Sequence, residues 1–341
     1  MVTLNIGDHV GPFLLVEKLG EGGFAEVWKA ERSDDADHFE ALKVPTDAEY
    51  AKQLRTEDRI RTGLDHPNIV RLLGEDLEAD PPYLRMEYVA GESLETRLQR
   101  EGALPPREAL DIAEQVALAL AYAHGRNVVH ADVKPSNVLV DAEGVVKLTD
   151  FGLGQVPRDA ARSVLKSAAH LSDARSRSIV GTFDYMAPEQ RAGDPIDARA
   201  DLYALGRMLY RMLTGSLPTG LRLPSEAKPG LPEALDGLVA RLLEAKESRT
   251  ASAAAFISEL GAARSAAARP IAVRPRVTPE LKSAAIAVIA TIVFFGVIGA
   301  FFAEGGGARP VGIVVLGMIA LIAFLLIRVS ASSRGRNRGS R

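Results

Sequence analysis

Cysteine is absent from this chain of 341 residues, and tryptophan occurs only once. Without cysteine the chain can form no disulfide and no thiolate site for a metal or for redox chemistry. The N-terminus lacks a basic stretch followed by an apolar run of the length that a secretory signal needs, so we expect the next segment to stay in the cytosol. No low-complexity tract occurs before residue 263, and charged residues make up 25% of the chain, which excludes disorder for most of its length.

Positive charge is scarce in the larger, N-terminal part of the chain. The whole sequence carries 41 Lys and Arg against 44 Asp and Glu, a formal net charge of -3. Residues 263–341 contain 11 basic and only two acidic side chains, so residues 1–262 are strongly acidic. An acidic body of that size argues against nucleic acid as the principal partner, and we expect none.

Short alternating apolar runs near the N-terminus are typical of β-strands. They cover residues 12–19, 25–31, 39–44 and 83–89. The pattern becomes helical near Tyr50, and a long amphipathic helix starts at Pro106 and ends at Gly125. A strand-rich part followed by a helix-rich part predicts two lobes with a cleft between them.

Two uncharged apolar runs lie beyond the acidic part of the chain. Residues 284–303 are long enough to cross a hydrocarbon core of about 30 Å at about 1.5 Å per residue. Residues 311–327 are at the short end of the spanning range, with Arg328 able to reach the interface. A buried hairpin in a protein core is the alternative, but no amphipathic sequence remains to cover it, and basic residues flank both outer ends. We therefore predict a transmembrane hairpin.

A glycine-rich turn lies between the first two long predicted strands. Gly20, Gly22 and Gly23 would let backbone amides approach phosphate oxygens, because glycine has no Cβ in the way. The turn is not a Walker A loop, since no Gly-Lys-Ser/Thr follows, and not a Rossmann turn, since the next element is a strand. Glycine-rich hairpins are common, so this turn alone is weak evidence.

Further motifs follow the turn in a fixed order. They are ALKV with Lys43, HPNIV at 66–70 with Glu57 nine residues before it, HADVKPSNVLV at 130–140, LTDFG with Asp150, GTFDYMAPE at 181–189 and DLYALG at 201–206. In this order and spacing the chain resembles the protein kinase superfamily, in its bacterial membrane-anchored Ser/Thr branch. The resemblance covers about residues 7–262.

The resemblance implies an α+β, bilobal protein kinase fold with a strand-rich N-lobe and a helical C-lobe, followed by the two-helix transmembrane hairpin. The boundaries we expect are 7–262 for the kinase domain (N-lobe about 7–89, C-lobe about 90–262), 263–282 for a basic juxtamembrane linker, 283–303 for the first transmembrane helix, 304–310 for a short external turn, 311–328 for the second transmembrane helix and 329–341 for a basic cytosolic tail.

The resemblance also implies how ATP is bound. Lys43, oriented by Glu57, would hold the α- and β-phosphates, while Asn137 and Asp150 would ligate Mg²⁺, or Mn²⁺ as the alternative ion. Met86 matches the residue before the hinge, whose backbone would bind adenine. The full set implied in nucleotide binding is Leu19, Gly20, Gly22, Gly23, Val27, Ala41, Lys43, Met86, Glu87, Val89, Asn137 and Asp150.

The acceptor side of the site is implied in the same way. Asp132 would orient the attacking hydroxyl and accept its proton, and Lys134 would neutralise the γ-phosphate. Lys134 and Thr182 match Ser/Thr kinases rather than Tyr kinases. Three architectural contacts are also implied: His130 stacked on Phe151, Asp201 anchoring that pair, and Glu189 paired with Arg249.

Several positions depart from the family pattern. Ala25 replaces the third glycine of the loop, which is common in the bacterial branch. Ala131 stands where many members carry an arginine that pairs with a phosphate on the activation segment, so we expect activity to depend little on phosphorylation there. Arg61 falls where the family usually has an apolar residue, so either the alignment slips by one or the helix is held differently.

The segment from Asp150 to Glu189 is long for the family. A mobile, solvated loop is the interpretation that we favour, and an inhibitory or substrate-docking helix is the other. A long mobile segment reaches active sites easily, which makes its serines candidates for autophosphorylation. These are Ser163, Ser167, Ser172, Ser176 and Ser178.

The sequence therefore predicts an ATP-dependent Ser/Thr kinase that acts on cytosolic proteins. One alternative is a pseudokinase that serves as a membrane scaffold or nucleotide sensor, which the intact catalytic positions disfavour. A small-molecule kinase of related fold is disfavoured by the DYMAPE segment and Thr182, which in the family build a ledge for a peptide. The basic flanks place the kinase domain and both termini in the cytosol, with residues 283–328 in the plasma (inner) membrane. Gly296 and Ala300 form a small-residue pair that would suit a homodimer.

Overall fold

The computed structural model describes residues 3–21, 25–33, 35–46, 63–151, 183–218, 220 and 222–267. The chain divides into two compact units, Met1–Ile271 and Ala272–Arg341, and all described residues belong to the first. The helix expected near Tyr50, most of the segment before Glu189 and both expected transmembrane helices lie outside the described residues. Within those residues, no helix combines the length and the apolar character needed to cross a membrane.

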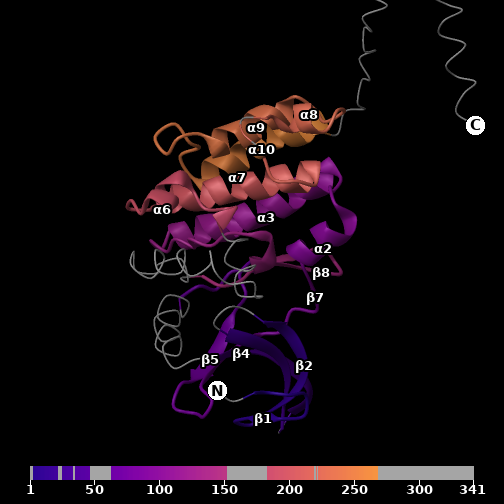
Figure 1. Cartoon of the computed structure of the whole chain (residues 1–341), viewed down its shortest axis with the longest axis vertical. Helices are drawn as coiled ribbons and strands as arrows, with labels where there is room; N and C mark the ends of the chain where they lie inside the picture. Colours follow the sequence, from indigo (N-terminus) through magenta and orange to yellow (C-terminus); the bar gives the residue numbers. More distant parts are fainter. Residues whose placement is uncertain are drawn as a thin grey trace, which may run out of the picture. The chain divides into compact units, whose positions relative to one another are not determined.

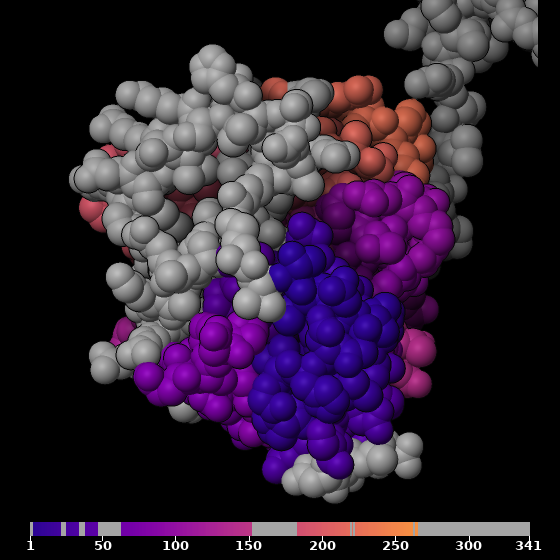
Figure 2. All heavy atoms as spheres, turned by 60° about the horizontal axis from the view of Figure 1, so that its bottom comes forward, coloured from indigo at the N-terminus to yellow at the C-terminus, as the bar shows by residue number. Residues whose placement is uncertain are grey.

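A six-stranded antiparallel sheet forms one end of the first unit (Figure 1). Its strands are β1 (His9–Val10), β2 (Phe13–Glu21), β3 (Ala25–Arg32), β4 (Asp35–Pro45), β5 (Leu72–Asp76) and β6 (Tyr83–Glu87), in the order β1-β2-β3-β4-β6-β5. Seen from this end, the atoms of β1 to β4, in indigo, form one continuous body (Figure 2). All four strands expected from the sequence are confirmed, as β2, β3, β4 and β6, and β1 and β5 are additional strands.

Alternation along β3 and β4 separates the two faces of this sheet. Successive side chains of a strand point to opposite faces, so residues two apart share a face. Trp28 and Leu42 lie in a buried cluster on one face. Val27 and Ala41 pack in a different cluster, and Lys43 follows Ala41 on that same face by the two-residue period. The pleat therefore places the buried Lys43 beside apolar side chains.

Helices make up the other end of the unit, with a small sheet at their edge (Figure 1). The helices are α2 (Leu94–Glu101), α3 (Pro106–His124), α6 (Pro188–Ala192), α7 (Ala198–Thr214), α8 (Pro224–Ala227), α9 (Ala234–Leu243) and α10 (Ala253–Ala267). The small antiparallel sheet consists of β7 (Gly91–Ser93), β8 (Val138–Asp141) and β9 (Val146–Leu148), and the 3-10 turn η1 (Pro135–Asn137) precedes β8. The long helix expected after Pro106 is confirmed as α3.

The largest hydrophobic core fills the space among these helices. Most of its fully buried side chains come from α3, α7, α9 and α10, among them Leu120, Leu209 and Phe256. Helix α10 continues to Ala267, past residue 262, where we expected the domain to end. Near its end, Arg264 forms ion pairs with Asp111 and Glu114 of α3. The strand-rich and helical parts fit the bilobal kinase fold, whereas the hairpin stays a prediction.

A buried ion pair joins α6 to the segment between α9 and α10, as the resemblance implied. The Arg249 Nη1 lies 2.6 Å from Glu189 Oε1, and Nη2 lies 3.1 Å from Oε2. Arg249 also donates to the carbonyl oxygens of Glu244 and Arg199. Burial alone would raise the pKa of Glu189, but the hydrogen bond from Arg249, a backbone hydrogen bond and the positive charges of Arg249 and Lys246 together outweigh burial and hold the pKa below its ordinary value.

We expect Arg249→Met to lower the free energy of unfolding by about 3–5 kcal/mol, because it leaves the carboxylate of Glu189 buried without its cation. Arg241→Met is the matched control. Arg241 pairs with Glu259, but both side chains are at least a third exposed, so the loss should stay below about 1 kcal/mol. Urea unfolding of the full chain, followed by far-ultraviolet circular dichroism, measures both changes. An equal decrease in the free energy of unfolding in the two variants would show that the buried pair stabilises the fold no more than the exposed pair does.

Candidate active site

The loop between α3 and η1 is held in place by one buried carboxylate. The side chain of Asp201, on α7, is 1% exposed and accepts the backbone N–H of His130 at 2.9 Å and of Ala131 at 2.7 Å. The His124 Nε2, at the end of α3, lies 2.8 Å from the same carboxylate. Ala131 has a φ of 63°, a left-handed conformation that side chains other than glycine rarely adopt. Two of these bonds come from the residues at this bend, so Asp201 fixes the path of the loop.

His130 connects this loop to the residues that follow β9. Its ring lies against the ring of Phe151, with centroids 4.4 Å apart, and both residues are buried. Nδ1 accepts the backbone N–H of Asp132, so the Nε2 at 2.8 Å from the carbonyl oxygen of Thr149 must carry the proton. Burial lowers the pKa of His130, which agrees with this neutral tautomer. The expected contact between the two rings and its anchoring by Asp201 are observed, but the rings are tilted by 48° rather than stacked in parallel.

Asp132, Lys134 and Asn137 converge on one point of the loop. The Lys134 Nζ lies 2.8 Å from the Asp132 Oδ2. The Asn137 Nδ2 donates to the same oxygen at 3.1 Å and to the Asp132 carbonyl oxygen at 2.8 Å. Both Asp132 and Lys134 keep a small exposed fraction. The arrangement presents a fixed carboxylate, with a cation beside it, to a group arriving from outside.

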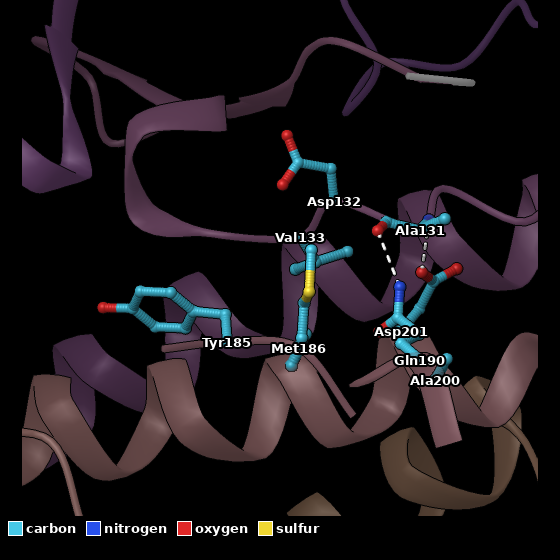
Figure 3. A pocket seen from close by; sticks show the side chains of 9 residues that line it. Ala131, Asp132, Val133, Tyr185, Met186, Gln190, Ala200 and Asp201 are labelled. Carbon is cyan, nitrogen blue, oxygen red and sulfur yellow. Dashed lines mark hydrogen bonds between the residues drawn. The ribbon is translucent and has the colours of Figure 1, made fainter. Parts of the chain in front are cut away.

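Asp132 also lines a small pocket (Figure 3). The pocket lies between the loop, the segment around Met186 and the start of α7, and Asp132 is on the opposite side from Ala200 and Asp201. The Gln190 Nε2 donates to the Ala131 carbonyl oxygen at 2.9 Å, which joins α6 to the loop. The residues that line it are Ala131, Asp132, Val133, Tyr185, Met186, Gln190, Ala200, Asp201 and Ala204.

Lys43 and Asp150 bring the two parts of the unit together. The Lys43 Nζ, on β4, lies 2.9 Å from the Asp150 Oδ1, just after β9. Asp150 has a φ of 64°, so the chain bends sharply at this residue. The Thr149 N–H donates to the Asn137 carbonyl oxygen at 2.9 Å, which holds Asn137 next to the segment that carries Asp150.

The donor set at this place fits a hard divalent cation. A carboxylate and an amide oxygen are the ligands that Mg²⁺ accepts, and Mg²⁺ completes its shell with water and phosphate oxygens. Asn137 directs its amide nitrogen to Asp132, which leaves its amide oxygen for another partner. Within the described ranges, no group of three or more acidic or His side chains could hold a metal ion. A cation bound by Asn137 and Asp150 would therefore also need oxygen atoms from water or phosphate.

An apolar cluster lies next to the Lys43–Asp150 pair. The buried residues Ala41, Val70 and Met86 form its centre. The side chains packed against them are Val27, Leu72, Val89 and Leu139. Four of these residues, Val27, Ala41, Met86 and Val89, were implied in nucleotide binding. Leu139, two residues after Asn137 on β8, was missed, although its position in an alternating strand next to a site residue is a usable signal.

The remaining expected site residues have different outcomes. Leu19 lies on β2 with an exposed side chain, and Gly20 is paired with Val27 across β2 and β3. The Glu87 Oε1, at the end of β6, accepts the Arg71 N–H and lies 2.8 Å from the Lys147 Nζ. The expected residues that lie outside the described part of the chain are Gly22, Gly23, Glu57, Arg61 and Thr182.

Comparison with known proteins identifies this arrangement. A family model described as the protein kinase domain matches residues 13–260. The serine/threonine-protein kinase PrkC of Bacillus subtilis is 36% identical over 219 residues, which are 62% of this chain and 32% of PrkC.

Two further relatives carry similar names. The probable serine/threonine-protein kinase PknB of Bifidobacterium longum is 33% identical over 280 residues, covering 73% of this chain and 39% of the relative. The serine/threonine-protein kinase PknB of Mycobacterium tuberculosis is 36% identical over 212 residues, covering 60% and 32%. The chain spans less than half the length of each of these relatives.

We expect Asp201→Asn to loosen the loop, because an amide offers one oxygen where the carboxylate offers two. At least one of the N–H groups of His130 and Ala131 then loses its acceptor, which costs about 1–3 kcal/mol. Hydrogen exchange of the peptide containing residues 128–134 should become about tenfold faster or more. Asp141→Asn is the control, because Asp141 caps its own exposed turn through Oδ1 alone. Unchanged exchange in Asp201→Asn would contradict the anchoring role.

Proposed function

This chain belongs to the protein kinase family, and from that membership we propose that it transfers the γ-phosphate of ATP to Ser and Thr hydroxyls of proteins. The relatives reported above are named serine/threonine-protein kinases, which supports this acceptor class. Among the described residues, the observation that carries most weight is the cluster in which Lys134 and Asn137 both lie within hydrogen-bonding distance of the Asp132 carboxylate. Few purely structural roles would require a carboxylate and a cation to be held together at a partly exposed pocket.

The acceptor hydroxyl would approach Asp132 from the pocket side. Its proton passes to the Asp132 carboxylate as its oxygen bonds to the γ-phosphorus, and the bond from that phosphorus to the β–γ bridging oxygen breaks to release ADP. Lys134, beside the Asp132 Oδ2, compensates negative charge that accumulates on the transferred group. Phosphoryl transfer needs little covalent help from the protein, so fixed positions and fixed charges supply most of the rate.

The nucleotide would occupy the other side of the site. The apolar cluster of Val27, Ala41, Met86 and Leu139 suits the faces of an adenine ring, and Lys43 lies where it can bind phosphate oxygens. Asn137 and Asp150 would hold the divalent cation, which neutralises phosphate charge when bound. We further propose that the chain phosphorylates itself on the serines between Asp150 and Glu189.

We expect Asp132→Asn and Lys43→Met each to lower transfer of label from γ-labelled ATP to a protein substrate by at least about a hundredfold, because each removes positioning of the reacting groups. Phosphorylation of the chain itself should also be lost in both variants. Asp141→Asn makes the same chemical change at an exposed turn outside the site and should leave transfer within about twofold of wild type. More than about a tenth of wild-type transfer in Asp132→Asn would mean that the assigned base is wrong, and no transfer by wild type would favour a pseudokinase.

We also propose that the chain is a membrane protein of the plasma (inner) membrane. The support comes from the sequence: two long uncharged apolar runs, at 284–303 and 311–327, with basic residues on both outer flanks. The connection between them carries only Glu304 and Arg309, so the bias of positive charge favours flanks in the cytosol and the glycine-rich turn outside. This orientation also gives the kinase domain access to cytosolic ATP.

The absence of cysteine makes this orientation directly testable. We expect a membrane-impermeant thiol reagent to label Gly306→Cys in intact cells, because residue 306 would lie outside. Ser333→Cys is the matched control and should react only after lysis, because it would lie in the cytosolic tail. Labelling of Ser333→Cys in intact cells, with protection of Gly306→Cys, would reverse the topology and leave the kinase domain without ATP.

A further inference from the structure

One face of α7 runs from the pocket beside Asp132 to a partly exposed pair of charges. Ala200 and Ala204 line the pocket. Residues three and four apart share one side of a helix, so Arg207 and Arg211 continue the same stripe. The C-terminal half of α7 therefore brings two arginines to the side of the helix on which the acceptor would bind.

Arg211 has its partners already. Its Nη1 lies 2.6 Å from the Glu95 Oε2 of α2 and donates to the Tyr185 hydroxyl at 2.8 Å, and its Nη2 donates to the Glu95 Oε1 at 2.9 Å. The bidentate pair raises the pKa of Arg211 further above its ordinary value. Because Tyr185 also lines the pocket, this pair positions a pocket wall, and the carboxylate of Glu95 neutralises the charge of Arg211.

Arg207 is different. Its side chain is partly exposed, and no carboxylate or other acceptor among the described residues bonds to it. Its Nε atom is buried and has no hydrogen-bond partner within the same part of the chain. Arg199, on the same helix, does donate, to the carbonyl oxygen of Lys246. A guanidinium keeps its proton under all ordinary conditions, so Arg207 brings to this face a positive charge that no described carboxylate pairs with.

We propose that Arg207 selects acidic substrates, by binding an Asp or Glu side chain close to the Ser or Thr that is phosphorylated. Phosphorylation of an acidic peptide rests on the proposed kinase function, whereas binding of the peptide does not. A partly buried guanidinium binds a carboxylate through two parallel hydrogen bonds, in a bidentate geometry. The Glu95–Arg211 pair supports this selection, because the carboxylate of Glu95 is already bound by Arg211.

The test uses the full chain and three fluorescent peptides, in which one serine is flanked on each side by three Glu, three Gln or three Lys. Binding is measured by fluorescence anisotropy and transfer by kcat/KM. We expect wild type to bind the Glu peptide about tenfold more tightly than the Gln peptide, with the same order in kcat/KM. Added salt should weaken the preference, since an accessible charge pair is screened.

Three variants decide the role of Arg207. Arg207→Met keeps the aliphatic stem and should bring the ratio between the Glu and Gln peptides to about one, whereas Arg207→Glu should make the Lys peptide the best ligand. Arg241→Met, an arginine of α9 paired with Glu259, should keep the wild-type ratio. If Arg207 had a purely structural role, its replacement could lower the affinity for all three peptides together but could not reverse the order of the three affinities.

The outcomes separate this inference from the proposed function. An equal affinity of wild type for the Glu and Gln peptides would overturn the inference, as would an unchanged ratio in both Arg207 variants. Binding that follows charge in the expected order, without any transfer of phosphate to the peptides, would support the inference and contradict the proposed kinase activity.

Discussion

The carboxylate of Asp201 is the constraint on which the rest of the site depends. An ionised carboxylate is stable in a protein interior only when hydrogen bonds replace its hydration, and here the donors are the backbone of the loop itself. The loop must therefore come to α7 and bend at Ala131, which accepts a left-handed conformation to do so. Asp132 follows this bend directly, so the hydrogen bonds between the loop backbone and Asp201 also set the direction of the Asp132 side chain.

A second constraint fixes the strand-rich part to this loop. Leu148 of β9 accepts the N–H of Val70 and donates its own N–H to the Asn68 carbonyl oxygen, so the segment before β5 pairs in parallel with β9. Two residues after Leu148 the chain reaches Asp150 and its ion pair with Lys43. The backbone pairing at Leu148 and the ion pair at Asp150 are two residues apart. This short segment therefore couples the position of Lys43 to the position of the loop.

The sequence was most informative where the signal is local. The long alternating strands and α3 could be predicted because their apolar periods extend over many residues, whereas β1, β7 and β9 have only two or three residues, too few for a period to be distinguished. β5 was missed although it is as long as β6. The site residues were predicted from ordered motifs, and the Glu189–Arg249 pair from the resemblance to a family. The Glu95–Arg211 pair joins positions 116 residues apart without any motif, so only the packing of α2 against α7 reveals it. Leu139 was missed although it lies two residues after Asn137 in an alternating strand, and its place in the apolar cluster is visible only where β8 meets β4 and β6.

In the function that we propose, helix α7 would connect the chemistry to substrate recognition, because both of its ends are held by fixed contacts. Near its start, Asp201 holds the loop that carries Asp132, and near its end, Arg211 donates to Tyr185 at the pocket wall. A helix rises by about 1.5 Å per residue, so the ten positions between these two contacts set a spacing of about 15 Å along its axis that side-chain motion cannot change. Arg207 lies between them on the same face. If phosphate is transferred at Asp132 and an acidic side chain binds Arg207, as we propose, the geometry of this one helix fixes the separation between the two positions.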